Sequence, residues 1–170
     1  MGERLASIIR DAGESDFDAI LRLNLESERF LSPLDRARLQ HLHRQAAYHR
    51  VALIDGAVAA FLLVLREGAD YDSPNYRWFA DRYPQFLYID RVVVDARQQG
   101  RRLGAALYRD LFEFARASGV RSVTCEFDVD PPNAASSAFH ARLGFREVGE
   151  QWIAQGRKKV SLQEARIAAR

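Results

Sequence analysis

The sequence predicts an α/β fold in which helices flank a central mixed β-sheet. The first observation is a near-continuous apolar run, Phe86–Val94, with the pattern of a strand covered on both faces. The second is the helical pattern of Gly104–Ser118, which follows that strand. The third is a hairpin signal, because the apolar segments Val51–Ile54 and Ala57–Leu65 flank Asp55–Gly56, a dipeptide that readily forms a two-residue turn.

The first half of the chain supplies further helices and strands. Polar clusters that can cap a helix precede two segments with apolar residues at helical spacing, and a polar, aromatic loop comes before the apolar run. The expected elements are a strand at Ala6–Arg10, a helix that begins after Glu14–Asp16 and ends near Arg29, a helix from Pro33 to about Gln45, and a short helix at Trp78–Arg82 within the loop 67–85.

The second half continues the alternation of strands and helices. Asp130 and two prolines stop one strand, and Asn133 can cap the helix that Gly144 closes. The expected strands are Ser122–Val129, Phe145–Trp152 and Lys158–Ser161.

Composition bounds the protein to one domain over residues 1–170, because a chain of this length with 48% hydrophobic residues can bury an adequate core. A formal charge of +2 is far from that of a nonspecific nucleic-acid binder. The amino terminus lacks the apolar core of a signal peptide, and no apolar run has membrane-spanning length. We therefore expect a cytoplasmic protein without a nucleic-acid or membrane partner.

Cysteine and histidine usage argues against a metal site. The single cysteine, Cys125, excludes an intrachain disulfide and a cysteine-based zinc cluster, and its place in a strand-like run suits a core thiol. His41, His43 and His49 lack the nearby carboxylate or cysteine pattern of recurrent metal sites. We expect them to lie on an ordinary surface helix.

The junction between the central strand and its helix favours an anion. Free N–H groups in the first helical turn and the helix dipole attract phosphate, while Gly100 and Gly104 permit close approach. Arg97, Arg101 and Arg102 can add charge-assisted contacts. The glycines would equally serve a simple turn with close helix packing. The nucleoside-triphosphate and dinucleotide motifs are both missing, so a different phosphate ligand is needed.

The stretch Tyr88–Val148 resembles the core of the GNAT superfamily of acyl-CoA-dependent N-acetyltransferases. That family's signature is Gln or Arg, two residues, Gly, one residue, then Gly or Ala. Gln99 and Gly104 match its first and last positions, while Arg102 replaces the middle glycine. A second block in the right order also matches, consisting of Asn133, Ser136, Phe139, His140, Leu143, Gly144 and Phe145.

The resemblance implies that acetyl-CoA (coenzyme A) is the cofactor. In the family the asparagine contacts the pantetheine arm, and the position of His140 is normally a tyrosine that protonates the departing sulfur. The family also splays the central strand with a bulge, which exposes backbone N–H groups. The implied cofactor-binding residues are Val92, Val93, Val94, Gln99, Gly100, Arg101, Arg102, Leu103, Gly104, Asn133, Ser136 and His140.

Acetyl transfer to an amine needs a proton acceptor, since a lysine-like amine has a reference pKa of about 10.4. Asp90 and Glu126 each interrupt an apolar strand and are the candidate bases, with Glu126 preferred. Either carboxylate would equally serve as the partner of an arginine such as Arg91 or Arg121. His140 can protonate the leaving thiolate, or it can serve helix capping or packing.

In the family the first two helices form one wall of the acceptor site. This resemblance assigns Asn24, Glu26, Glu28 and Phe30 to substrate binding, and Tyr71–Tyr83 to the opposite wall. Acidic and aromatic residues suit a cationic amine, although they equally suit an ordinary solvated helix face.

The resulting hypothesis is an N-acetyltransferase that uses direct attack by a small-molecule or peptide amine on acetyl-CoA. Arg102 and His140, at altered positions, motivate a second hypothesis: a catalytically weakened coenzyme A-binding sensor or partner-binding module. A third, a phosphate-binding domain unrelated to coenzyme A, leaves the second block unexplained. The residues do not select the acceptor or the acyl length, and a homodimer is compatible with each hypothesis.

Overall fold

The computed structural model describes residues 7–28 and 31–169. The strands are β1 (Ile8–Asp11), β2 (Tyr48–Ile54), β3 (Ala57–Arg66), β4 (Leu87–Val94), β5 (Ser122–Asp130), β6 (Arg146–Ile153) and β7 (Lys158–Arg166). The helices are α1 (Phe17–Glu26), α2 (Arg36–Gln45), α3 (Pro74–Ala80), α4 (Leu103–Ala117) and α5 (Ala134–Arg142), with short 3₁₀ turns at Glu14–Asp16 and Ala96–Gln98.

Within the described residues, the strands form a seven-stranded sheet in the order β1-β2-β3-β4-β5-β7-β6. β4 pairs with β5 in parallel, whereas β1 with β2, β2 with β3, β5 with β7, and β6 with β7 are antiparallel. The predicted α/β fold with a central mixed sheet is therefore confirmed.

The chain divides into two compact units. The first contains the described residues up to Leu65 together with Asp90–Leu111, and the second contains Arg66–Ile89 and the described residues from Phe112 onward. β4 and α4 each contribute to both units, so neither unit is a continuous segment of sequence. The single domain over residues 1–170 stays a prediction.

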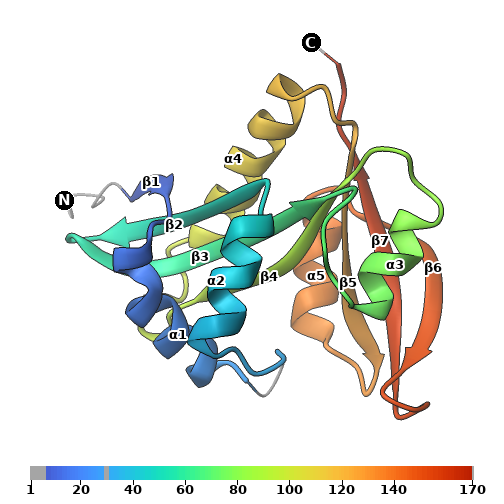
Figure 1. Cartoon of the computed structure of the whole chain (residues 1–170), viewed down its shortest axis with the longest axis horizontal. Coiled ribbons are helices and arrows are strands. Elements are labelled where there is room, and N and C mark those ends of the chain that lie inside the picture. The colour runs from blue at the N-terminus through green and yellow to red at the C-terminus, as the bar shows by residue number, and fades with distance from the viewer. Residues whose placement is uncertain (1–6, 29–30, 170) are drawn as a thin grey trace. The chain divides into compact units, whose positions relative to one another are not determined.

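In the first unit, two neighbouring residues of β2 contact helices on opposite faces of the sheet. The hydroxyl of Tyr48 donates to the carboxylate of Asp110 on α4 at 2.7 Å. The ring of His49, which points to the opposite face, contacts the rings of His43 on α2 and Phe61 on β3. Figure 1 shows α1 and α2 on one side of β2 and β3, with the first half of α4 behind these strands.

Turn and capping chemistry sets the ends of several elements. Asp55 and Gly56 both have positive φ, 51° and 77°, as the predicted hairpin turn requires. α2 begins later than predicted, because the side chain of Asp35 accepts from the amide of Arg38 at 2.7 Å and caps the helix there. α3 begins earlier than predicted, because Ser73 caps a helix with proline in its first turn.

In the second unit, the two faces of β5 carry different side chains. Phe127 stacks on His140 of α5, with 5.6 Å between ring centroids. On the other face, Glu126 accepts a hydrogen bond from Tyr88. α3 reaches the outer strand, since Asn75 accepts from the side chain of Gln151 on β6 at 2.6 Å. Figure 1 shows α3 in front of β6 and β7 and α5 behind this part of the sheet.

Among the described residues, no helix has both the length and the apolar character that crossing a bilayer requires. Residues 7–28 and 31–169 also hold no group of three or more His, Cys, Asp or Glu placed to bind a metal ion. Cys125 is 2% exposed, which confirms its predicted place in the core.

A partly buried pair, His43 on α2 and His49 on β2, differs from the predicted surface helix of histidines. Nδ1 of His43 and Nδ1 of His49 are 2.8 Å apart, and His49 is only 7% exposed. Nε2 of His49 has no hydrogen-bond partner within the described residues. Burial, together with the nearby His43, lowers the pKa of His49 from 6.5 to about 4.

Stability should therefore fall as the pH is lowered through this range. Below pH 6.5 the unfolded chain binds a proton at His49 that the folded chain binds only near pH 4. We expect the free energy of unfolding to drop by up to about 2 kcal/mol between about pH 7 and pH 5. Urea denaturation at both pH values measures this drop. His49→Leu should remove most of it and the control His41→Gln should not; an equal drop in His49→Leu would contradict the assignment.

Candidate active site

The loop after β4 is held together by Asp95. The amide of Asp95 donates to the carbonyl of Ala59 at 2.8 Å, and its Oδ1 accepts from the amide of Arg97 at 2.9 Å. The Arg97 guanidinium also donates to the carboxylate at 2.8 Å and holds the pKa of Asp95 at about 2. The charge of Arg97 is therefore used within the loop, while Arg101 and Arg102 are exposed.

The backbone at the start of α4 has the shape of an anion site. Gly100 and Arg102 both have positive φ, 83° and 59°. The amide of Ala106 donates to the carbonyl of Arg102 at 3.0 Å and closes the first turn. The amides of the preceding helical residues have no acceptor within the helix, and they lie at the positive end of its dipole. These amides and the guanidinium groups of Arg101 and Arg102 fit a diphosphate.

Arg102 keeps a backbone conformation that suits glycine, although its side chain makes that conformation costly. The left-handed region costs a residue with a Cβ roughly 1–2 kcal/mol. The departure from the glycine signature thus leaves the turn itself in place. A strained residue at such a turn is typical of a functional loop.

Arg102→Gly should therefore stabilise the protein. Relief of the left-handed strain exceeds the added entropy of the unfolded chain, so we expect a net gain of roughly 0.5–1 kcal/mol in the free energy of unfolding. Arg101→Gly is the matched control, since Arg101 is also exposed but is not among the residues with positive φ. It should lose stability. Urea denaturation of both variants measures these changes in the free energy of unfolding. A lower free energy of unfolding in Arg102→Gly would contradict the strain argument.

The second predicted block lies at the start of α5, in the other unit. The side-chain oxygen of Asn133 accepts from the amide of Ser136 at 3.2 Å, which confirms the predicted cap. The side-chain NH₂ of Asn133 makes no hydrogen bond within residues 7–28 and 31–169, so it can donate to a ligand. Contact with pantetheine stays a prediction.

His140 is enclosed rather than open to solvent. It is 4% exposed, and its ring packs against those of Phe127, Phe139 and Phe145. Its Nδ1 lies 2.8 Å from the carbonyl oxygen of Ser136, which favours a proton on Nδ1. Burial lowers the pKa of His140, so the neutral imidazole dominates near neutral pH. This environment supports the packing role, and the acid role stays a prediction.

Glu126 has a hydroxyl partner. The OH of Tyr88 donates to Oε2 of Glu126 at 2.7 Å. Tyr88 is 1% exposed and sits among the rings of Tyr71, Tyr76 and Phe79. Glu126 itself is half-buried, so its carboxylate is oriented by Tyr88 and still reachable. These features suit a proton acceptor.

Asp90 is held in a buried ion pair in the first unit. Its carboxylate lies 2.6 Å from the Nε of Arg91, and the two side chains are 3% and 4% exposed. Arg91 also donates to Oδ1 of Asn24 at 3.0 Å and to the carbonyl of Ser32 at 3.2 Å. This arrangement favours the structural alternative for Asp90, a carboxylate paired with an arginine.

The predicted acceptor residues lie in different environments. Asn24 is fully buried and ties α1 to the segment that follows it through Arg91 and Ser32. Glu26 and Glu28 are exposed. Phe30 lies outside the described residues. Val93 is buried and Val92 and Val94 are half-buried, and the oxyanion role of their amides stays a prediction.

Comparisons with known proteins decide the family. The profile of the "Acetyltransferase (GNAT) family" matches residues 15–145, which is more than half of the chain. This protein belongs to the GNAT acetyltransferase family. It is thus an acetyltransferase, and its cofactor is acetyl-CoA. No curated protein matches the GNAT chain by sequence.

Solved structures share the fold of this GNAT protein at low sequence identity. The ribosomal-protein-S18-alanine N-acetyltransferase from Escherichia coli has a TM-score of 0.72 at 18% identity, with 97% of this chain and 96% of that chain covered. Ard1 from Thermoplasma volcanium has a TM-score of 0.76 at 18% identity, with 96% and 99% covered. YncA from Salmonella typhimurium, solved with its cofactor acetyl-CoA, has a TM-score of 0.70 at 20% identity, with 97% and 96% covered.

Proposed function

We propose that this protein transfers the acetyl group of acetyl-CoA to an amine by direct attack, with Glu126 as the proton acceptor. The observation that carries the proposal is the half-buried carboxylate of Glu126, fixed at 2.7 Å by the hydroxyl of Tyr88. The acceptor is a small-molecule or peptide amine. One neighbour's name, the ribosomal-protein-S18-alanine N-acetyltransferase, adds support for an N-terminal peptide amine as one acceptor to examine.

Each group of residues has a distinct part in this proposal. Acetyl-CoA, when bound, supplies a thioester carbonyl that a neutral amine can attack. Glu126 takes the proton from the ammonium form of the acceptor, and Tyr88 keeps the carboxylate oriented. The amides of Val92–Val94 would stabilise negative charge on the carbonyl oxygen. Cys125 is fully buried and burial raises its thiol pKa, which argues against a covalent relay.

Binding of the donor rests on two further sets of groups. The amides at the start of α4, with Arg101 and Arg102, would hold the diphosphate. The NH₂ of Asn133 would donate to the pantetheine arm.

A thiol-release assay with acetyl-CoA and a panel of amines and peptides tests the function. Release that depends on an added amine is the expected result, and longer acyl donors in the same assay define the acyl length.

The burial of His140 favours a second candidate, a catalytically weakened coenzyme A-binding sensor. A neutral imidazole enclosed by Phe127, Phe139 and Phe145 is a poor proton donor. A thiolate leaves well without an acid, so we place this candidate second. Coenzyme A binding without turnover across the amine panel would favour it over the enzyme.

Reversing two charges at the start of α4 should weaken the binding of acetyl-CoA. In the double variant Arg101→Glu/Arg102→Glu we expect the KM for acetyl-CoA to rise at least about tenfold, because charge-assisted contacts to the diphosphate are lost and repulsion replaces them. S-acetylpantetheine lacks the diphosphate, so its KM should stay unchanged. Arg109→Glu, at an exposed position of α4, is the control. Equal losses with both donors would place the diphosphate elsewhere.

A further inference from the structure

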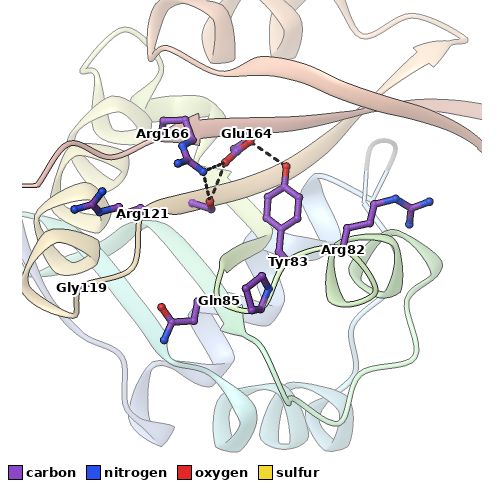
Figure 2. A pocket seen from close by; sticks show the side chains of 9 residues that line it. Arg82, Tyr83, Gln85, Gly119, Arg121, Glu164 and Arg166 are labelled. Carbon is purple, nitrogen blue, oxygen red and sulfur yellow. Dashed lines mark hydrogen bonds and ion pairs between the residues drawn. The ribbon is translucent and has the colours of Figure 1, made fainter.

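The second unit contains a cavity of about 550 Å³ that shares only Arg82 and Tyr83 with the predicted acceptor wall Tyr71–Tyr83. The α3–β4 loop, the turn between α4 and β5, and the end of β7 surround it (Figure 2). Its lining residues are Arg82, Tyr83, Pro84, Gln85, Gly119, Arg121, Ser122, Glu164 and Arg166.

Glu164, the acidic residue of this lining, is fully engaged by protein donors. Its carboxylate accepts from the hydroxyl of Tyr83 at 2.9 Å and from the hydroxyl of Ser122 at 2.8 Å. The guanidinium of Arg166 donates to it at 3.1 Å, and the Glu164 side chain is 11% exposed. Figure 2 shows these groups drawn together by their hydrogen bonds. The negative charge of Glu164 is thus offset by Arg166 and is not available to a cation.

Two arginines of the lining have no acidic partner in the part of the chain that the structure describes. Arg82 lies over the ring of Trp78, 4.1 Å from its centroid, and donates to the carbonyl of Trp78 at 2.9 Å. Arg121 is exposed, and its side chain has no recorded partner within residues 7–28 and 31–169. Figure 2 shows the Arg82 side chain pointing away from Arg121, so Arg121 supplies the positive charge that an anion in the cavity would meet. A carboxylate would balance this charge.

The remaining surfaces favour an organic anion over an inorganic one. The ring of Tyr83 and the side chain of Pro84 offer apolar surface beside the arginines, and the amide of Gln85 adds a donor. Planar guanidinium groups bind carboxylates through two parallel hydrogen bonds. The cavity volume lies in the range of small-molecule sites. We propose that this cavity binds a small organic carboxylate, with Arg121 as its principal contact.

Calorimetry on the full chain without acetyl-CoA tests this proposal, so its result does not depend on the proposed activity. The probes are succinate, neutral succinamide and inorganic phosphate. Succinate should bind, and Arg121→Gln should weaken its Kd at least about tenfold. Arg121→Lys keeps the charge without the planar guanidinium, so its Kd for succinate should lie between those of the unchanged protein and Arg121→Gln. The control Arg146→Gln, at an exposed position of β6 outside the cavity, should change the Kd less than about twofold.

Three outcomes would overturn the proposal. Failure of the folded protein to bind succinate would exclude a carboxylate site. Phosphate binding as tightly as succinate would show that the apolar surfaces play no part. Equal losses of succinate affinity in Arg121→Gln and Arg146→Gln would show general charge attraction instead of a defined site. Circular dichroism of each variant confirms that it is folded before the binding is compared.

Discussion

Arg91→Met is expected to lower the free energy of unfolding by about 3–5 kcal/mol, the usual cost of leaving a buried charge without its partner. The carboxylate of Asp90, 3% exposed, would lose a guanidinium 2.6 Å away. Oδ1 of Asn24 and the carbonyl of Ser32 would lose a donor at the same time. Methionine keeps most of the side-chain volume, so the loss reports the charge and hydrogen bonds more than a cavity. Urea denaturation measures the change.

The double variant Asp90→Leu/Arg91→Met is the matched control. Removing both charges together removes the carboxylate that Arg91→Met deprives of its guanidinium, so the double variant should recover a large part of the stability lost in Arg91→Met. If Asp90 is structural, the double variant should also retain most of its turnover at a temperature where it is folded. A double variant no more stable than the single one would contradict the ion-pair argument. Loss of turnover in a folded double variant would instead return Asp90 to the candidate bases.

Local sequence signals predicted the elements whose ends depend on a single strong residue. Asp55–Gly56 defined the hairpin, and Asn133 and Gly144 marked the two ends of α5. Weaker signals competed elsewhere. Ser73–Pro74 is a good helix start, but it lies in a polar stretch that resembles a loop. β7 extends beyond the predicted Ser161 because Leu162, Gln163 and Ala165 are buried in the sheet, where β7 continues to pair with β5.

The candidate site was predictable to the extent that it depends on short motifs. The loop from Gln99 to Gly104 was found from its glycines, but the left-handed backbone of Arg102 follows from the fold, since its residue type argues against that conformation. Tyr88 was missed as the partner of Glu126 because the two are 38 residues apart. The parallel register, which places Tyr88 beside Thr124, brings them together. The pairing of Asp90 with Arg91 was foreseen as an alternative, whereas its links to Asn24 and Ser32 required the structure.

The surroundings of Glu126 make this carboxylate a better candidate base than Asp90. Tyr88 supplies one hydroxyl at 2.7 Å, and the side chain remains half-buried. Asp90, in contrast, has an arginine at 2.6 Å and almost no exposure. A base must be reachable by the proton that it takes, and the buried side chain of Asp90 offers an acceptor amine little access.

Glu126→Gln should therefore reduce kcat by about 10² to 10⁴, the range that general base catalysis contributes. The amide keeps the size of the side chain and can still accept from Tyr88, so folding and the Kd of acetyl-CoA should be preserved. Tyr88→Phe removes only the orienting hydroxyl and should cost less than Glu126→Gln. Asp128→Asn is the matched control, because Asp128 shares this face of β5 but pairs with Lys158 at 3.2 Å. Thiol release measures kcat, and calorimetry measures donor binding. A folded Glu126→Gln enzyme with unchanged kcat would show that the amine loses its proton to water or to another group, and Glu126 would then be a positioning residue at most.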